Sequence, residues 1–403
     1  MLKPNENSLL DRKSRMDTIP YGRQDISEED INAVVGILRS DFLTQGPAIP
    51  AFEKAISSYC GVNYSIATNS ATSALHIACL ALDVGVGDIV WTVPNTFVAT
   101  ANCALYCGAT IDFVDIDPLT YNLSVQCLEE KLVLSAMSGK LPKVLIPVHL
   151  CGQPCDMQGI YELSRKYGFK IIEDASHAIG AKYKGRLIGG CEYSDITVFS
   201  FHPVKIITTG EGGMAVTNNP VLAKRMRLLR SHGISSASED MHPRPIHEIW
   251  NYQQIDLGFN YRITDIQAAL GLSQLTRLDS FVEKRCQIAF RYSEQLANFP
   301  IQLPWQHPDG QSSFHLYPIR VRLSESGKTQ REVYEALQRA GIGVNLHYIP
   351  VYRQPYYERK GFKVGYCSEA ERYYSEAISI PLYYGLSVSK QDRVVEAIGE
   401  AMR

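Results

Sequence analysis

The sequence has no uninterrupted apolar run that approaches the ~20 residues a membrane-spanning helix needs. It also has no internal repeat and no low-complexity segment. Neither sign of charge is in excess, because 40 Lys and Arg face 42 Asp and Glu for a formal net charge of −2. This balance argues against a general nucleic-acid or membrane-surface binder, although a few local Arg and Lys would suffice for a small anionic substrate.

The N-terminal segment lacks the apolar centre of a secretory signal. Residues 1–17 read MLKPNENSLLDRKSRMD, which is polar and of mixed charge. We therefore expect a polar arm and a cytoplasmic protein. The 10 cysteines are spread through 403 residues rather than gathered in a short framework, which fits reduced and mostly buried thiols.

Paired cysteine motifs of the zinc-binding kind are also missing. His149, Cys151, Cys155 and Asp156 stand together, but they contain a single C-x-x-x-C and no second pair follows. A structural loop is the favoured interpretation of this cluster over a zinc site, and we expect no metal.

Two common phosphate-binding motifs are absent as well. The sequence contains no G-x-x-x-x-G-K-[ST], and the pair Gly85 and Gly87 precedes a predicted strand rather than a helix. A dinucleotide-dependent dehydrogenase is therefore disfavoured.

Short apolar runs alternate with helical stretches between about residues 60 and 220. Several of the runs lack the polar alternation of half-exposed strands, so they are predicted to be buried on both faces. The alternation predicts an α/β fold with a large, mostly parallel sheet and helices on both of its sides. The predicted strands are 89–93, 111–114, 144–148, 170–172, 196–199 and 214–216, and the predicted helices include 72–82 and 157–167.

A length of 403 residues predicts two or three domains, or one large domain with an appendage. A first helix is expected after Ser27, with Asp30 in the capping-box position. After about residue 265 the pattern changes to helices at 266–275, 329–340 and 391–402 and a strand at 316–321. We therefore predict an N-terminal arm and first helix over 1–40, a large α/β domain over 41–265 and a smaller C-terminal α+β domain over 266–403.

Two polar residues follow predicted strands, at the sheet edge where parallel sheets bind ligands. For Asp174, a strand-end cap is the ordinary interpretation, and an acid paired with a cationic ring nitrogen is the functional one. For Lys205, a surface lysine is the commoner case, but an apolar setting lowers the pKa of an amine and makes it a nucleophile for Schiff-base chemistry. The glycines at 210, 212 and 213 favour the functional interpretation, because they let the backbone approach a ligand closely.

Residues 69–73 open a predicted helix after a strand. Free backbone N–H groups and the helix dipole favour a phosphate at that end, with simple N-capping by Ser or Thr as an equally good alternative. Phe97 follows the strand at 89–93. It either stacks on a planar cofactor or packs as an ordinary core side chain.

Seven segments, in their order and spacing, carry a resemblance to one family. They are Leu43-Thr-Gln-Gly-Pro47, Asn69-Ser-Ala-Thr-Ser-Ala-Leu75, Pro94-Asn-Thr-Phe-Val-Ala-Thr100, His149-Leu-Cys-Gly-Gln153, Glu173-Asp-Ala-Ser-His177, Phe199-Ser-Phe-His-Pro-Val-Lys205 and Gly258-Phe-Asn-Tyr-Arg262. From about residue 19 to the C-terminus the chain resembles the DegT/DnrJ/EryC1/StrS nucleotide-sugar aminotransferases. The resemblance implies a fold-type I enzyme dependent on pyridoxal 5'-phosphate (PLP), and a homodimer with shared active sites.

The resemblance also implies roles for single residues. Lys205 would hold PLP covalently, Asp174 would pair with the pyridine nitrogen, and these two are the expected catalytic residues. His177 stands where relatives often have Gln and would lie near the phenolic oxygen of PLP. The other implied cofactor contacts are Phe97 stacked on the ring, the backbone around Ala71, Thr72 and Ser200 at the phosphate, and Asn260 at the phosphate in the neighbouring subunit.

Residues 69–75 and 201–213 resemble the pseudaminic-acid branch of the family most. That branch implies amino transfer from L-glutamate to C4 of a UDP-4-keto-6-deoxy-N-acetyl hexose. It also implies substrate contacts from Tyr21, Leu43, Thr44, His347 and Tyr348. For the last two, a structural turn at 347–350 is the alternative.

Three alternative functions stay open. The first is an aminotransferase for another 4-keto nucleotide sugar, of the bacillosamine, perosamine or aminoarabinose type. The second is a dehydratase that uses pyridoxamine phosphate (PMP), which Lys205 disfavours because those relatives replace the lysine by histidine. The third is a non-catalytic regulatory protein, which Lys205, Asp174 and Asn260 together disfavour.

Overall fold

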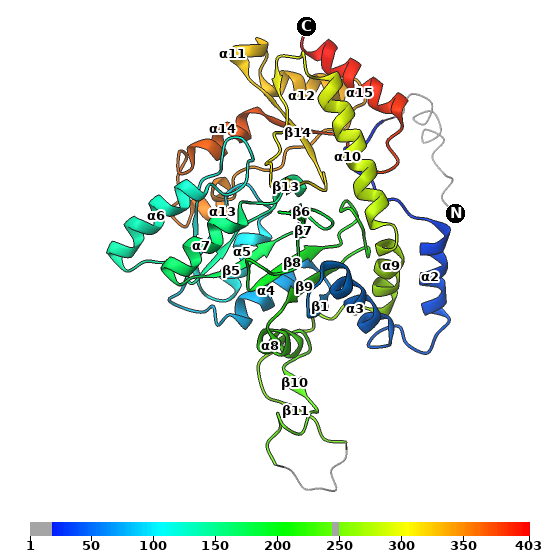
Figure 1. The fold of residues 1–403 in the computed structure, drawn as a ribbon, viewed down its shortest axis with the longest axis vertical. Helices are drawn as coiled ribbons and strands as arrows, with labels where there is room; N and C mark the ends of the chain where they lie inside the picture. The colour runs from blue at the N-terminus through cyan, green and yellow to red at the C-terminus, as the bar shows by residue number, and fades with distance from the viewer. Residues whose placement is uncertain (1–17, 244–249) are drawn as a thin grey trace, which may run out of the picture.

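A seven-stranded β-sheet forms the centre of the larger part of the molecule (Figure 1). The computed structural model describes residues 18–243 and 250–403. The strands from β8 to β3 pair in parallel, and β9 runs antiparallel to both of its neighbours, which confirms a mainly parallel sheet. The order is β1 (Tyr64–Thr68), β9 (Gly213–Thr217), β8 (Ile196–Ser200), β5 (Lys170–Asp174), β4 (Val144–Ile146), β2 (Ile89–Thr92) and β3 (Thr110–Phe113).

The strands are buried as their apolar sequences predict. Every residue of β4, β8 and β9 is buried, which fits strands covered on both faces. Each of the six apolar runs predicted to be a strand coincides with a strand of this sheet to within two residues at either end.

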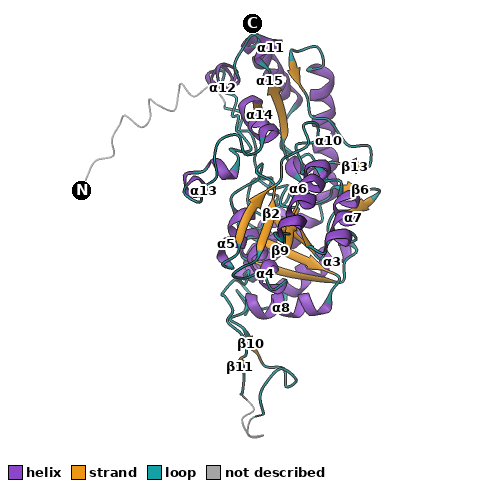
Figure 2. Cartoon of the chain, turned by 90° about the vertical axis from the view of Figure 1, so that its left-hand side faces the viewer, coloured by secondary structure: helices purple, strands orange, loops and turns teal. Residues whose placement is uncertain are grey.

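Helices cover both faces of the sheet. α4 (Ala71–Ala81) packs across β1, β5, β8 and β9 and against α5 (Ala99–Tyr106) and α8 (Pro220–Arg230). α7 (Met157–Tyr167) packs on β5 and on α6 (Val125–Ser138). In Figure 2, α5 lies on one side of the strands and α6 and α7 lie on the other. The predicted helices at 72–82 and 157–167 are confirmed by α4 and α7.

The first described helix, α2 (Glu28–Leu38), begins with the predicted capping box. Asp30 N–H donates to Ser27 Oγ, and Ser27 N–H donates to Asp30 Oδ2 over 2.9 Å. α2 packs on α9 (Asp265–Leu275), which packs on α3 (Ala48–Cys60). The boundary between the large and small domains at residues 265 and 266 stays a prediction. Residues 1–17 of the expected arm lie outside the described residues.

A second hydrophobic core belongs to the C-terminal part of the chain. Its antiparallel sheet consists of β12 (Ile301–Gln302), β14 (Tyr317–Val321) and β15 (Ala377–Ile380). The buried side chains between sheet and helices include Ile288, Ile319, Leu337 and Ile398. The helices are α10 (Leu278–Gln295), α12 (Gln330–Arg339) and α15 (Val388–Ala401), so the predicted smaller α+β domain is confirmed.

The N-terminal segment reaches this second core. Ile19 is fully buried there, its N–H donates to Gly341 O over 3.0 Å, and its carbonyl accepts from Gly343 N–H. The remaining short elements are η1 (Leu150–Gly152), η2 (Val351–Arg353), α11 (Leu323–Ser326), α13 (Pro355–Glu358), α14 (Ser368–Glu376) and a small sheet of β13 (Gly310–Gln311), β6 (Lys182–Tyr183) and β7 (Arg186–Leu187).

A hairpin formed by β10 (Ile234–Ser235) and β11 (Gln253–Gln254) projects from the large sheet domain, at the bottom of Figures 1 and 2. Trp250, Tyr252 and Leu257 on it are largely exposed. Across residues 18–243 and 250–403, the helices are all too short or too polar to pass through a lipid bilayer.

Candidate active site

The carboxyl ends of β5 and β8 bring the first predicted site residues together. Asp174 ends β5, and its side chain is buried. Thr100 of α5 donates to Asp174 Oδ2 over 2.7 Å, and Ser176 N–H donates to Oδ1 over 3.1 Å. The carboxylate is therefore held from two sides, with a fixed orientation.

Lys205 lies in the loop after β8, and its N–H donates to His202 O over 2.9 Å. Burial lowers the pKa of the Lys205 amine to about 8, against the opposing effects of Asp174 and Cys151. Burial disfavours the charged amine, while a nearby carboxylate favours it. The amine is therefore close enough to Asp174 to interact with it, and a much larger fraction is in the nucleophilic free-base form than for an ordinary lysine.

His177 lies beside these two residues and is buried. Its Nδ1 accepts from Cys151 N–H over 3.3 Å, and its Nε2 lies 3.2 Å from the hydroxyl of Tyr348. The His315 ring packs on it with the ring centres 4.4 Å apart. Burial, and then the positive charge of Lys205, hold the pKa of His177 well below its usual value, so the ring is neutral.

Two of the predicted substrate residues join this cluster from the C-terminal part of the chain. His347 is buried, its Nδ1 lies 2.9 Å from Ser379 Oγ, and burial with the charge of Lys205 lowers its pKa to about 3. Its ring centre lies 5.5 Å from that of Tyr21. The ring centre of Tyr348 lies 6.4 Å from that of Phe97, whose side chain is exposed.

The N-terminus of α4 forms the other side of the site. Ser70 caps the helix by accepting from Ser73 N–H, so the amides of Ala71 and Thr72 have no acceptor within the described chain. Ser200, the last residue of β8, pairs with Gly213 at the start of β9. A Cβ at Gly213 would lie 2.5 Å from Ala71 N, so only glycine allows this close approach.

Three further predicted residues lie on exposed parts of the chain. Asn260 is exposed, and its carbonyl accepts from the side chain of Asn69 over 3.5 Å. Leu43 and Thr44 are also exposed, in the loop before α3, where Leu43 O accepts from Asp265 N–H. No hydrogen bond or ring contact found in the described residues connects any of the three to Lys205 or Asp174.

The structure adds two residues that the sequence did not single out. Thr100 orients Asp174, and the signal for it was present, since Thr100 ends the segment 94–100 that carries part of the family resemblance. His315 packs on His177 from a segment with no recognisable motif. Only the tertiary structure brings His315 to the site.

The cluster around His149 is structural. His149 Nε2 lies 2.8 Å from Glu173 Oε2, and His149 Nδ1 accepts from Cys155 N–H over 3.0 Å. Both ring nitrogens are therefore used within the protein, as the loop interpretation expects. No three His, Cys, Asp or Glu side chains of residues 18–243 and 250–403 gather as a set of metal ligands.

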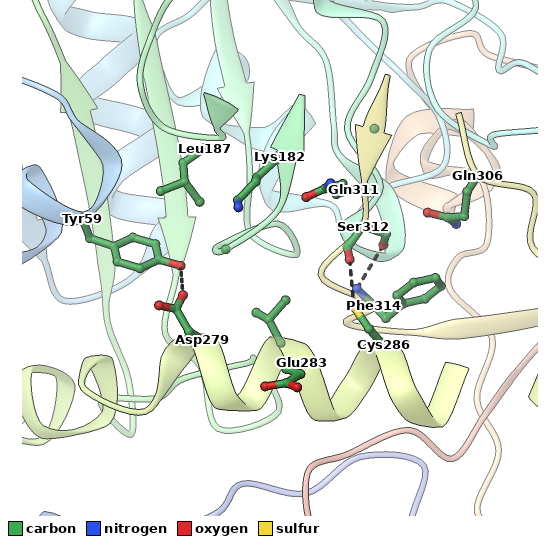
Figure 3. Close-up of a pocket in the computed structure, with 13 residues that line it drawn as sticks. Tyr59, Lys182, Leu187, Asp279, Glu283, Cys286, Gln306, Gln311, Ser312 and Phe314 are labelled. Atoms are coloured by element: carbon green, nitrogen blue, oxygen red, sulfur yellow. Dashed lines mark hydrogen bonds between the residues drawn. The ribbon is translucent and has the colours of Figure 1, made fainter. Parts of the chain in front are cut away.

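A separate pocket of about 660 Å³ opens between α10 and the small sheet of β6, β7 and β13 (Figure 3). Its wall carries Lys182, Asp279 and Glu283, and Tyr59 donates to Asp279 across it over 2.7 Å. None of the predicted site residues lines this pocket. Ser313 separates it from the candidate site, since the neighbours of Ser313 line the pocket and its own hydroxyl donates to His177 O.

Comparison with known proteins identifies the family. The DegT/DnrJ/EryC1/StrS aminotransferase family matches residues 24–399. The chain belongs to this family. This aminotransferase is 38% identical over 371 residues to the UDP-4-amino-4,6-dideoxy-N-acetyl-beta-L-altrosamine transaminase of Campylobacter jejuni, covering 92% of this chain and 94% of the relative. It is 37% identical over 388 residues to the spore coat polysaccharide biosynthesis protein SpsC of Bacillus subtilis, covering 96% and 97%.

Solved structures agree with this assignment. Helicobacter pylori PseC, an aminotransferase involved in the biosynthesis of pseudoaminic acid, superposes with a TM-score of 0.85 at 30% identity over 96% of this chain and 99% of PseC. Spr1654 of Streptococcus pneumoniae, solved in PLP and PMP forms, gives 0.85 at 31% identity over 96% and 98%. This member of the family is a PLP-dependent sugar aminotransferase that acts on nucleotide sugars.

The residues of the DegT/DnrJ/EryC1/StrS site fit PLP. A buried carboxylate at Asp174 suits a protonated ring nitrogen, and a lysine amine of lowered pKa suits a covalent bond to an aldehyde. The two free amides at the start of α4, close to the backbone of Gly213, suit a phosphate. The predicted fold-type I architecture and cofactor are therefore confirmed.

Proposed function

We propose that the enzyme transfers an amino group from L-glutamate to C4 of a UDP-4-keto-6-deoxy-N-acetyl hexose. The product would be UDP-4-amino-4,6-dideoxy-N-acetyl-β-L-altrosamine, a precursor of pseudaminic acid. The observation that carries the proposal is the Lys205 amine with its pKa lowered to about 8 beside the buried carboxylate of Asp174. Similarity to the Campylobacter transaminases and to PseC supports the choice of sugar.

We assign the cofactor contacts as follows. Lys205 holds PLP covalently, Asp174 pairs with the pyridine nitrogen, and Phe97 covers the ring. The amides of Ala71 and Thr72 bind the phosphate with the hydroxyls of Thr72 and Ser200. His177 lies on the side of the ring oxygen, and Asn260 serves the phosphate in the partner subunit.

Lys205 is the base and acid of the proposed reaction. Its free amine would take a proton from Cα of the amino donor, and the protonated amine would return it to the cofactor carbon on the other side of the transferred nitrogen. A pKa of about 8 keeps both forms of the amine available near neutral pH. Bound PLP supplies the electron sink for the carbon that loses its proton. Asp174 keeps the ring nitrogen protonated, which strengthens that sink, and Thr100 and Ser176 hold its carboxylate in place.

The sugar would be held by Tyr21, Leu43, Thr44, His347 and Tyr348. His347 is neutral at working pH, because its pKa is lowered to about 3, so it contributes hydrogen bonds rather than charge. Asn260, Leu43 and Thr44 are exposed, and none of the described hydrogen bonds or ring contacts joins them to Lys205 or Asp174 of their own chain. Their exposure supports a homodimer in which they serve the partner's site. We place the enzyme in the cytoplasm, where nucleotide sugars are made.

Another 4-keto nucleotide sugar is the second candidate for the acceptor. The identity to Bacillus subtilis SpsC, a spore coat polysaccharide biosynthesis protein, is 37%, and the identity to the Campylobacter jejuni transaminase is 38%. Because these two identities are nearly equal, the comparison with SpsC favours this second candidate. The dehydratase alternative is disfavoured by Lys205 itself.

The test is a panel of UDP-linked 4-keto-6-deoxy-N-acetyl hexoses of both configurations, each incubated with the enzyme and L-glutamate. Product mass and stereochemistry are read by mass spectrometry and NMR, and oxoglutarate is measured alongside. We expect the enzyme to aminate the keto sugar whose product is the β-L-altrosamine derivative, with release of one equivalent of oxoglutarate. Lys205→Ala should give neither product, and it should lack the absorption band of covalently held PLP. If only a keto sugar of the other configuration is aminated, the acceptor is the second candidate, another 4-keto nucleotide sugar.

A further inference from the structure

The hydrogen bonds of His177 determine which of its ring nitrogens carries the proton. Cys151 N–H can only donate, so the Nδ1 atom that accepts it has no hydrogen. The ring is neutral, and its single proton therefore resides on Nε2. Nε2–H faces the Tyr348 hydroxyl at 3.2 Å, so His177 donates and the tyrosine oxygen accepts.

This direction leaves the Tyr348 hydroxyl hydrogen unused. No residue in the described ranges accepts it, since the contact with His177 is the one hydrogen bond that this hydroxyl makes there. A donor that is largely removed from water and left without an acceptor is costly, so a bound molecule is the natural partner. The ring of Tyr348 lies next to the ring of Phe97. The charge of Lys205 lowers the pKa of His177, and the charge of Asp174 raises the pKa of Tyr348, so both pairs lie close enough to interact.

We propose that His177 is a positioning residue that fixes the Tyr348 hydroxyl as a hydrogen-bond donor to an oxygen of the bound reactants. The acceptor chemistry is a carbonyl or phenolate oxygen. Two such oxygens come to this site, the C4 carbonyl of the sugar and the ring oxygen of PLP. The proposal rests on the proposed function for the identity of these acceptors, but the proton position on His177 does not depend on it.

The surroundings of His177 keep this arrangement fixed. The His315 ring packs on the His177 ring with the ring centres 4.4 Å apart, and Ser313 Oγ donates to the His177 carbonyl over 3.1 Å. Both the ring and the backbone of His177 are thus restrained. Burial raises the pKa of the Tyr348 phenol above its usual value, so the phenol keeps its hydrogen at working pH.

The proton position is tested directly by NMR on the holoenzyme labelled with ¹⁵N-histidine. Correlations between ring carbon-bound hydrogens and ring nitrogens distinguish the two neutral tautomers and the charged form. We expect His177, identified by its loss in His177→Gln, to be the Nε2–H tautomer from pH 6 to 9. A protonated Nδ1 at His177 would overturn the proposal, whether or not the enzyme aminates the expected sugar.

Variants test the role of the pair. Tyr348→Phe and His177→Leu should each lower kcat/KM about tenfold, the size expected for one lost hydrogen bond. Because they remove the same donor, the double variant should stay near tenfold rather than reach about a hundredfold. Glutamine can accept from Cys151 N–H and donate to Tyr348, so His177→Gln should recover most of the loss. Tyr356→Phe, an exposed tyrosine, is the matched control. Multiplicative losses in the double variant would contradict the proposal.

Two measurements on Tyr348→Phe identify the acceptor: the pH midpoint of the cofactor absorption band and KM for the sugar. If the PLP ring oxygen is the acceptor, the pH midpoint of the cofactor absorption band shifts while KM for the sugar stays constant. If the sugar carbonyl is the acceptor, KM for the sugar rises about tenfold and the band is unchanged. Either result supports the donor role of Tyr348, and a variant that changes neither quantity overturns it.

Discussion

Thr100 Oγ1 donates a hydrogen bond of 2.7 Å to Asp174 Oδ2, although 74 positions separate the two residues in the chain. Thr96 Oγ1 lies 2.7 Å from Thr100 Oγ1 and must be the donor there, because the Thr100 hydrogen is already given to the carboxylate. All three side chains are buried. A chain of hydroxyls in α5 and the loop before it thus sets the orientation of the acid that we assign to the PLP ring nitrogen.

Replacing Thr100 by valine keeps the shape of the side chain and removes this donor. A hydrogen bond to a charged group is worth roughly 1.5–3 kcal/mol, so we expect kcat/KM to fall about tenfold or more, with PLP still bound. Thr100→Ser keeps the hydroxyl and should stay near the parent activity. Steady-state kinetics with the accepted keto sugar checks this. If the valine and serine variants are equally active, the Thr100 hydroxyl does not contribute to catalysis.

The lowered pKa of Lys205 predicts how cofactor capture depends on pH. The amine adds to an aldehyde only as the free base, and its pKa is about 8. The rate at which the cofactor-free enzyme captures PLP should therefore rise with pH through about 8 and then level. Absorbance of the covalently held cofactor, followed after mixing at about pH 6 to 11.5, gives the profile on both sides of the two midpoints. A midpoint at the ordinary lysine value of about 10.4 would show that the amine is not buried.

The close approach of Gly213 to Ala71 allows a steric test of the phosphate contact that we assign to Ala71. An added Cβ would lie 2.5 Å from Ala71 N and 2.5 Å from Ser70 C, so β9 or α4 must shift. Gly213→Ala should weaken PLP binding at least tenfold and lower the midpoint of thermal unfolding. Gly36→Ala lies in the last turn of α2, where an added Cβ meets no atom within 4 Å. It is the matched control and should be neutral or stabilising by about 0.5–1 kcal/mol. PLP titration and calorimetry distinguish the two variants.

Glu173, the residue before Asp174, is expected to contribute to the stability of the fold. It is buried, and it accepts from Thr197 Oγ1 over 2.9 Å while pairing with His149. Burial pushes its pKa up, but His149 and the hydroxyl donors outweigh this and hold the pKa below its usual value. Its contribution is therefore present above the unfolded-state pKa and lost as pH falls through the lower folded-state value. Glu173→Ala should cost about 3 kcal/mol and Glu173→Gln less, measured by chemical unfolding at pH 7.

The sequence predicted those parts of the molecule that depend on local pattern. Apolar runs predicted the strands of the large sheet, and the strand-end rule led to Asp174 and Lys205 before any contact was known. The contacts that orient these groups could not be predicted from the sequence. Thr100 lies far from Asp174 along the chain, as His177 does from Tyr348, and only the tertiary structure brings each pair into contact. The contacts of the loop that carries Leu43 and Thr44 also have no signal in residue types, since they follow from how α3 and α9 pack.

Asp265 connects the loop of residues 43–47 to the rest of the large core. It is fully buried at the start of α9, its Oδ2 accepts from Gly46 N–H over 2.8 Å, and its Oδ1 accepts from Ala48 N–H over 2.9 Å. Its own N–H donates to Leu43 O, so one side chain and its backbone fix both ends of the loop that carries Thr44. If this loop contacts the sugar, loosening it should raise KM for the sugar while the PLP absorption band stays unchanged.

Asp265→Ala removes both acceptors and leaves two amides unsatisfied, so we expect KM for the sugar to rise about tenfold and stability to fall by about 2 kcal/mol or more. Asp265→Asn keeps one acceptor and should lie between the alanine variant and the parent. Asp41→Ala removes an exposed carboxylate just before the same loop and controls for charge. An alanine variant that loses stability with an unchanged KM would mean that the loop supports the fold without touching the sugar, and Leu43 and Thr44 would then leave the substrate site.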